Sequence, residues 1–381
     1  MTRAPRVYLD HHATTPLSKA ARDAMVRALD ELHGNPSSVH RAGRHARSAL
    51  EDARASLAAN VGSTPRELVF TSGGTEAVHL AVGGVGEALD VTRVFCDPGA
   101  HPCLRSASEA LAAKRGVPFE WIPTVQGGDG AFDLDALASK LCAGALVAVS
   151  AVQHETGAIC DLAALHPVVA HARATWVLDA AQMLGKVAVD LSLLGAAAVA
   201  LSAHKIGGPQ GVGALWLRTG ERVVQRQTGG AQERGVRAGT ENVLGAVGFG
   251  AAASTLTGRL ARMTDVGRLR DRIETALLAC GGVVVNGATR RRASTACHVS
   301  IEGVHGHELV AALDLEGIEV SSGAACSSGK ADPSESLMRL YPEAPWRATS
   351  ALRVTLGPEV TEGDVDRAIE VIPAVIARHR R

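Results

Sequence analysis

Ser202-Ala-His-Lys-Ile-Gly-Gly-Pro-Gln-Gly-Val-Gly213 follows directly on the apolar run Ala196–Leu201, and this junction indicates the fold of the chain. The apolar run is typical of a buried strand, and the polar and glycine-rich residues are typical of the turn that ends it. Lys205 is therefore expected to be partly desolvated. Desolvation and nearby positive charge lower the pKa of a lysine and free its amine to form a Schiff base. Taken alone, the segment is better explained as a loop with a surface lysine.

Apolar β-branched runs alternate with alanine-rich helical stretches from about residue 16 to residue 260. This alternation is typical of a mostly parallel sheet covered by helices, so we predict an α/β fold. Helices are expected at Leu17–Leu32 and Gly43–Ala59, and buried strands at Glu67–Thr71, Ala145–Val152, Thr175–Asp179 and Ala196–Ser202. Open α/β sheets bind ligands at the carboxyl ends of their strands, so a cofactor is expected at the turns after these strands.

The last third of the chain predicts a smaller α+β unit. Leu256–Leu278 is expected to form one long linking helix. After it, strands are expected at Gly282–Val285, Ala296–Ile301, Ile318–Ser321 and Ala351–Leu356, and helices at Glu308–Glu316 and Glu362–Arg378. We predict two domains: a large cofactor-binding domain of residues 16–255, and a small domain made of residues 1–15 and 256–381.

The composition excludes several classes of protein. Of the 381 residues 46% are hydrophobic, and 39 basic side chains balance 39 acidic ones. Disorder is excluded as the main state, and direct nucleic-acid binding is not expected without excess basic charge. The apolar runs are far shorter than the roughly 20 residues that span a bilayer, and no apolar signal region precedes Val7. We therefore expect no membrane association and a cytoplasmic location.

The seven cysteines are scattered and include no pair at C-x-x-C spacing. Neither a disulfide framework nor a zinc site is expected from this pattern.

Phe70-Thr-Ser-Gly-Gly-Thr-Glu76 has the pattern of a strand, a glycine turn and the start of a helix. The backbone N–H groups at such a helix start bind phosphate. The segment lacks the ending of a Walker loop, and a helix capped by Thr75 explains it equally well.

Asp179 closes the strand Thr175–Asp179 and is expected in the same crevice as Lys205. A buried carboxylate needs a positive partner, which an ordinary salt bridge or a protonated pyridine nitrogen can supply. A lysine that accepts an aldehyde, a phosphate cradle and a pyridinium partner together indicate pyridoxal 5'-phosphate (PLP). No other lysine is expected at a strand end.

In these motifs the chain resembles the cysteine desulfurases, PLP-dependent enzymes of the class V aminotransferase group, of the nitrogenase and iron–sulfur assembly type. The resemblance runs through Tyr8–Pro16, Gly34–His40, Phe70–Glu76, Glu155–Gly157, Asp179–Lys186, Ser202–Gly213, Gly229–Glu233, Arg237–Asn242, Ser321–Ser328 and Arg353–Gly357. It implies the PLP-dependent transferase fold of type I.

The resemblance also implies a role for individual residues. Lys205 would bind the PLP aldehyde, Asp179 would pair with the pyridine nitrogen, and Gln182 would hydrogen-bond the ring hydroxyl. His101 would stack on the ring. The phosphate would be bound by Gly74, Thr75, Ser202 and His204, and by Thr240 from the other subunit of a homodimer.

Cys326 matches the nucleophilic cysteine of the family, and the small residues around it suggest an accessible thiol. Arg353 and Asn35 would bind the substrate, with the planar guanidinium of Arg353 suited to its carboxylate.

Two departures from the family pattern are evident. His154 stands where the family has an Asn near the ring hydroxyl, and an imidazole is bulkier than an amide but can still donate a hydrogen bond. His11 and His12 follow Asp10 where the family has Asp-Asn. A metal site at these histidines is not expected, because adjacent strand residues point to opposite faces.

The implied reaction converts L-cysteine to L-alanine and leaves the sulfur on Cys326 as a persulfide. His101 is the candidate for proton transfer. A sulfur-acceptor protein is the expected partner, in iron–sulfur assembly, thiolation or phosphorothioation. The alternatives are another class V enzyme, such as a selenocysteine lyase or an aminotransferase, and an inactive scaffold that docks onto a sulfur-transfer partner.

Overall fold

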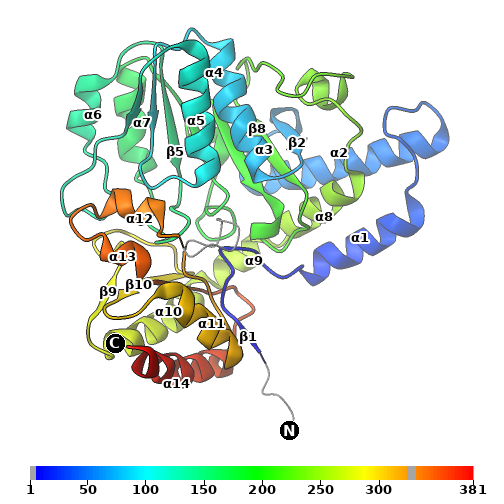
Figure 1. The fold of residues 1–381 in the computed structure, drawn as a ribbon. Coiled ribbons are helices and arrows are strands. Elements are labelled where there is room, and N and C mark those ends of the chain that lie inside the picture. The colour runs from blue at the N-terminus through cyan, green and yellow to red at the C-terminus, as the bar shows by residue number, and fades with distance from the viewer. Residues whose placement is uncertain (1–5, 324–331, 381) are drawn as a thin grey trace.

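The computed structural model describes residues 6–323 and 332–380 (Figure 1). Within them, seven strands form the main sheet in the order β2-β8-β7-β6-β5-β3-β4. These strands are β2 (Leu68–Thr71), β3 (Arg93–Cys96), β4 (Phe119–Trp121), β5 (Ala145–Ser150), β6 (Thr175–Asp179), β7 (Ala198–Ser202) and β8 (Gly213–Leu217). β8 runs antiparallel to both of its neighbours, and the other adjacent pairs are parallel. The predicted mostly parallel α/β sheet is confirmed.

The strands are buried on both faces, which explains their unbroken apolar sequences. Along β5, Val147 and Val149 lie in one hydrophobic core, whereas Leu146 and Ala148 lie in the other. The helices around this sheet are α1 (Lys19–Glu31), α2 (Arg41–Val61), α3 (Gly74–His79), α4 (Val85–Ala88), α5 (Pro102–Arg115), α6 (Leu134–Lys140), α7 (Leu162–His171) and α8 (Val243–Ala253). α3, α4 and α5 cover one face, and α2, α7 and α8 cover the other.

The pairing register aligns the carboxyl ends of the central strands. Ser150 pairs with Asp179, and Ser202 pairs with Gly213, the first residue of β8. Gly213 also pairs with Thr71, the last residue of β2. The turns that follow β2, β5, β6 and β7 therefore meet at one edge of the sheet.

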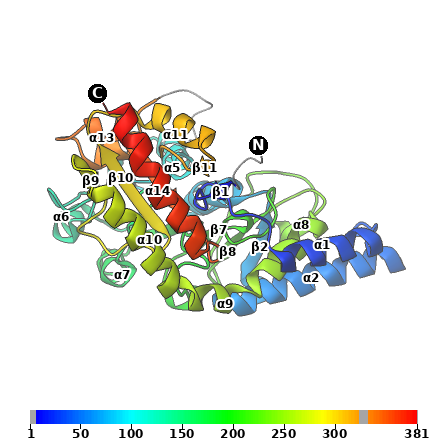
Figure 2. The same ribbon diagram turned by 90° about the horizontal axis from the view of Figure 1, so that it is seen from below.

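The second part of the chain packs below the main sheet (Figures 1 and 2). β12 (Ala351–Thr355), β10 (Ala296–Ile301) and β9 (Val283–Val285) form an antiparallel sheet in that order, and β1 (Val7–Tyr8) pairs with β11 (Ile318–Glu319). The helices are α9 (Leu256–Ala261), α10 (Met263–Leu278), α11 (Gly306–Leu315), α12 (Glu335–Leu340), α13 (Trp346–Thr349) and α14 (Glu362–His379). One core joins Val7 and Leu9 to side chains from residues 263–376. The division into residues 16–255 and residues 1–15 with 256–381 stays a prediction.

The expected single helix Leu256–Leu278 is wrong, because the structure has two helices, α9 and α10, with Arg262 between them. The apolar residues on the two sides belong to different cores: Leu256 packs in a core of the main sheet, and Met263 packs in the core of the second part. The break lets the chain pass from one core to the other. None of the described helices is long and apolar enough to cross a membrane.

Candidate active site

A cavity of about 250 Å³ lies at the carboxyl ends of β5, β6 and β7. Nine of the residues that the sequence singled out line it: Gly74, Thr75, His101, His154, Asp179, Gln182, Ser202, His204 and Lys205. They come from five separate stretches of the chain, and the alignment of the strand ends brings them together.

Lys205 follows β7 by three residues and is half-buried. Its Nζ donates to the backbone oxygens of His12 and Ala13, at 2.9 Å for Ala13. Ala13 also lines the cavity. The amine is thus held at the cavity wall by neutral carbonyl groups, a setting that a surface lysine does not have.

Asp179 is the last residue of β6 and is 9% exposed. Its Oδ1 accepts the backbone N–H of Ala181 at 3.0 Å, and no salt bridge reaches it from the part of the chain that the structure describes. Burial raises the pKa of Asp179, although the Ala181 N–H and the charges of His154 and Lys205 act in the opposite direction. A buried carboxylate that faces a cavity without a paired cation suits a ligand that carries a positive nitrogen.

The start of α3 is open toward the cavity. Its N-cap residue is Gly73, which makes no side-chain cap, so the expected alternative of a Thr75 cap is wrong. A Cβ on Gly74 would lie 3.2 Å from the Cβ of Ser202, which shows how closely the helix start approaches the end of β7. Uncapped N–H groups beside the Ser202 hydroxyl form a cradle that fits an anion such as phosphate.

His101 caps the start of α5, because its Nδ1 accepts the backbone N–H of Cys103 at 3.2 Å. The Sγ of Cys103 lies 3.0 Å from the same nitrogen. Burial, followed by the charges of His154 and Lys205, lowers the pKa of His101 to about 3. A neutral ring whose Nδ1 is an acceptor carries its proton on Nε2.

Cys103 is the described cysteine that lines this cavity, and sequence reasoning did not single it out. Burial raises the pKa of its thiol strongly, and the Asp179 carboxylate adds to the effect. Because the thiolate is the reactive form, Cys103 is a poor nucleophile.

His154 forms the opposite wall, with its ring 5.1 Å from that of His101 in an edge-to-face arrangement. Its Nε2 lies 3.3 Å from Oε1 of the buried Glu155. Burial raises the pKa of Glu155, but the hydrogen bond and charge of His154, with His298 and Ser334, outweigh it and lower this pKa to about 2. The Glu155 carboxylate therefore lies where it would stabilise a positive charge on His154.

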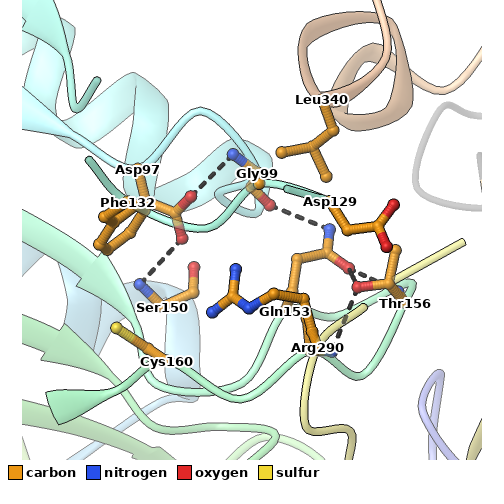
Figure 3. A pocket seen from close by; sticks show the side chains of 12 residues that line it. Asp97, Gly99, Asp129, Phe132, Ser150, Gln153, Thr156, Cys160, Arg290 and Leu340 are labelled. Carbon is orange, nitrogen blue, oxygen red and sulfur yellow. Dashed lines mark hydrogen bonds between the residues drawn. The ribbon is translucent and has the colours of Figure 1, made fainter. Parts of the chain in front are cut away.

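Gln153 hydrogen-bonds the loops that carry both histidines, and Figure 3 shows its contacts with Gly99 and Thr156. Its Nε2 donates to the backbone oxygen of Gly99 at 3.0 Å, and this hydrogen bond joins the loop before His101 to the segment after β5. Its Oε1 accepts the backbone N–H groups of Glu155 at 2.8 Å and Thr156 at 2.5 Å, which closes the turn that carries His154. Gln153 lines a separate cavity of about 20 Å³, which shares Ser150 with the large one.

Lys186 is a second buried lysine near the end of β6, which sequence reasoning did not single out, and it does not line the cavity. Its side chain is 8% exposed, and its Nζ donates to Oε1 of the cavity residue Gln182 at 2.6 Å. The signal was in the sequence, since Lys186 follows β6 by only seven residues.

Three of the predicted residues that the structure describes do not line the cavity. Arg353 is buried behind its wall, where Nη1 donates to the His154 backbone oxygen at 3.3 Å and Nη2 pairs with Asp10 at 2.9 Å. Thr240 is exposed and lines another cavity, of about 80 Å³. Asn35 lies between α1 and α2, where its Oδ1 accepts the N–H of Ser37. Cys326 lies outside the described residues.

His11 and His12 lie in a turn and not in a strand, so the reason for dismissing them as ligands was wrong. His12 is buried, with Nε2 2.9 Å from Oγ1 of Thr295, whereas His11 packs edge-on against Tyr8. No group of three or more potential metal ligands occurs within residues 6–323 and 332–380.

The buried histidines predict a loss of stability in acid. Burial, with nearby positive charge, lowers the pKa values of His11 and His298 to about 4, whereas an unfolded chain binds these protons near pH 6.5. Between pH 6.5 and 4 the unfolded state holds more protons, so stability falls as the pH falls. We expect the melting temperature of the apoprotein to drop by about 5–10 °C from pH 7 to pH 4.5. His298→Gln should flatten this slope, and the exposed His33→Gln should leave it unchanged. A melting temperature constant over this range contradicts the burial of neutral histidines.

Comparison with known proteins identifies the family. The profile of the family Aminotransferase class-V matches residues 7–368. An IscS-like cysteine desulfurase of Mycobacterium tuberculosis is 37% identical, with 98% of this chain and 97% of that protein covered. A cysteine desulfurase of Bradyrhizobium diazoefficiens is also 37% identical, with coverages of 99% and 96%. The solved structure of a NifS-like protein has a TM-score of 0.90 and 27% identity, with coverages of 98% and 100%. The chain belongs to the class-V aminotransferase family, among the cysteine desulfurases.

Proposed function

We propose that this protein is a PLP-dependent cysteine desulfurase that converts L-cysteine to L-alanine and carries the sulfur as a persulfide on Cys326. The observation that carries the proposal is the single cavity in which the Lys205 amine, the unpaired Asp179 carboxylate and the uncapped start of α3 meet. These groups match the aldehyde, the pyridine nitrogen and the phosphate of PLP. Bound PLP supplies an electron sink for the bond-breaking at the substrate Cα.

The proposed contacts to PLP follow the cavity walls. Lys205 binds the aldehyde carbon, Asp179 pairs with the ring nitrogen, and His101 covers a ring face. Gln182 and His154 lie on the side of the ring oxygen. The phosphate is assigned to Gly74, Thr75, Ser202 and His204, all of which line the cavity.

Lys205 is also the proposed base at the substrate Cα. Its Nζ donates to the backbone oxygens of His12 and Ala13, and Lys205 lines the cavity in which the substrate would bind.

His101 is proposed to donate a proton from Nε2. Its Nδ1 accepts the Cys103 N–H at the start of α5, so the neutral ring carries its proton on Nε2. The low pKa of about 3 makes a protonated His101 a short-lived and strong acid.

The substrate carboxylate is assigned to Arg353. Its guanidinium contacts the backbone of His154, and its buried Nε has no hydrogen-bond partner within the described residues. An unpaired buried donor is costly, and a carboxylate would satisfy it. The assignment of Asn35 to the substrate stays a prediction from the family pattern.

The sulfur transfer is balanced: the Cys326 thiol and the substrate thiol yield a persulfide on Cys326 and L-alanine. Gly323 and Ser334, on either side of Cys326 in the sequence, both approach Glu155. A Cβ on Gly323 would lie 2.6 Å from Oε2, and the Ser334 hydroxyl donates to the carboxylate at 2.8 Å. Since Glu155 contacts His154, the described residues Gly323 and Ser334 lie near the cavity wall.

The test of this function is the stoichiometry of turnover. The holoenzyme with L-cysteine and a thiol reductant should release alanine and sulfide in equal amounts. Keto acid in place of alanine would indicate an aminotransferase, and turnover restricted to L-selenocysteine would indicate a selenocysteine lyase. Purified protein without a PLP absorption band and without turnover would indicate an inactive scaffold.

The proposed partners are a second copy of this chain and a sulfur-acceptor protein. The six described cysteines are all free, in keeping with the proposed cytoplasmic location. Exposed apolar side chains on α1 and in the loop after it, Val26, Leu29 and Val39, offer a surface that a second copy would cover.

Thr240 is proposed to reach the PLP phosphate of the other subunit. Thr240→Ala should weaken PLP binding about tenfold, the cost of one hydrogen bond to a charged group. Mixing a Lys205→Ala chain with a Thr240→Ala chain should restore one intact site in each heterodimer. Activity should therefore rise above that of either homodimer once subunits exchange. Proven exchange without this rise would place Thr240 in the site of its own subunit.

A further inference from the structure

Lys186 is a buried lysine among cationic side chains, and burial, followed by the charges of these neighbours, lowers the pKa of its amine. Its side chain is 8% exposed, and Lys205, Arg259 and Arg353 act on it as positive neighbours. Within residues 6–323 and 332–380, no salt bridge joins Lys186 to an acidic side chain. Its Nζ donates to Oε1 of Gln182 at 2.6 Å. A well-packed apolar side chain of similar size would avoid the desolvation cost of a lysine here.

The contact with Lys186 decides which end of the Gln182 amide faces which neighbour. In the structure Lys186 Nζ donates to Oε1, so the amide oxygen points toward Lys186. The amide nitrogen then points the other way, where it donates to the backbone oxygen of His12 at 2.8 Å. His12 O also accepts from Lys205 Nζ, which places the Gln182 nitrogen beside the Lys205 amine.

An amide nitrogen carries two hydrogens, and His12 takes one of them. Gln182 lines the cavity, so its second hydrogen is available to a ligand there. With its oxygen held by Lys186, the amide presents a donor, and it can bond an anionic oxygen but not a second donor. If the amide were free to rotate, it could equally present its oxygen to the ligand, which would repel an anion.

We propose that Lys186 is a positioning residue for cofactor recognition, which locks the Gln182 amide so that its N–H selects a PLP ring oxygen in its anionic form. The inference rests on the proposed function, because it takes PLP as the ligand of this cavity. It adds a residue outside the cavity wall that acts only through Gln182.

The experiment compares two ligands on the apoprotein, PLP and 3-O-methyl-PLP, whose ring oxygen is neutral. Dissociation constants are measured by absorbance and by fluorescence quenching. Lys186→Met keeps the length of the side chain and removes its donors. Wild type should prefer PLP over the methylated ligand about tenfold more strongly than Lys186→Met does, the value of one hydrogen bond to a charged acceptor. The intrinsic effect of the methyl group on the linkage to Lys205 is the same in both proteins and cancels from this ratio.

Two controls separate positioning from a structural role. Gln182→Met should lose the same preference, and adding Lys186→Met to it should change nothing further, because both act through one hydrogen bond. The apoprotein melting temperature of Lys186→Met should be equal to or above that of wild type, since a buried polar amine has been replaced by an apolar side chain. The exposed Lys140→Met should match wild type throughout.

The outcomes distinguish this inference from the proposed function. A wild-type apoprotein that binds neither ligand would overturn the proposed function. Wild type that binds PLP while Lys186→Met keeps the full preference would overturn the role of Lys186 alone. If Lys186→Met fails to fold, Gln182→Met with Lys186 intact decides the matter, because retention of the preference there excludes recognition through Gln182.

Discussion

Lys205→Ala is expected to abolish the covalent attachment of PLP and to lower turnover of L-cysteine by at least about 10³-fold. The reason is positional, because Lys205 is the lysine that lines the cavity with Asp179 and the start of α3. Borohydride reduction followed by peptide mapping should find PLP on Lys205 in wild type and on no lysine in the variant.

Lys186→Met is the matched control for this experiment. It removes the other buried lysine of the region, which hydrogen-bonds Gln182 and does not line the cavity. This variant should keep the reducible attachment of PLP at Lys205. Recovery of PLP on the Lys186 peptide, or full activity of Lys205→Ala, would show that the wrong amine has been assigned.

Cys326→Ser is expected to stop alanine formation, by at least about 10³-fold, while PLP stays bound. PLP binding and removal of the Cα proton depend on Lys205 and Asp179, whereas the attack on the substrate sulfur requires a thiolate, and serine is a far weaker nucleophile at neutral pH. After brief exposure to L-cysteine, mass spectrometry of wild type should find one added sulfur, about 32 Da, on the Cys326 peptide.

Cys103→Ser is the control, because Cys103 is the described cysteine in the cavity wall. Its raised thiol pKa and its contact with His101 predict that it carries no persulfide. Serine at position 103 can still hydrogen-bond His101, so most of the activity should remain. If the sulfur is found on Cys103, or if Cys326→Ser produces alanine at the wild-type rate, the assignment of Cys326 as the nucleophile is wrong.

Most strands could be predicted because burial on both faces demands an unbroken apolar sequence. Thr175–Asp179 and Ala196–Ser202 were expected from such runs, and the structure has β6 at Thr175–Asp179 and β7 at Ala198–Ser202. The prediction of one helix over residues 256–278 was wrong, because the burial of this region could not be read from its sequence. Helical periodicity is a local signal, and nothing local shows that Leu256 and Met263 pack in different cores.

The cavity wall was anticipated in part. Lys205, Asp179 and Ser202 end or follow strands, and the ends of adjacent parallel strands must meet at one edge of a sheet, so their proximity follows from the pattern alone. His101 and His154 came from family motifs. Their roles toward PLP remain proposals.

What the sequence determined by itself is the fold class, the edge of the sheet where the site lies and the family, because these depend on periodicity and on motifs at fixed spacing. What only the tertiary structure decided is how each group is held. Gln153 joins two loops, Lys186 orients Gln182, and Arg353 sits behind His154. These contacts depend on side-chain directions and distances between segments far apart in the chain, and such geometry is decided only when the two cores pack.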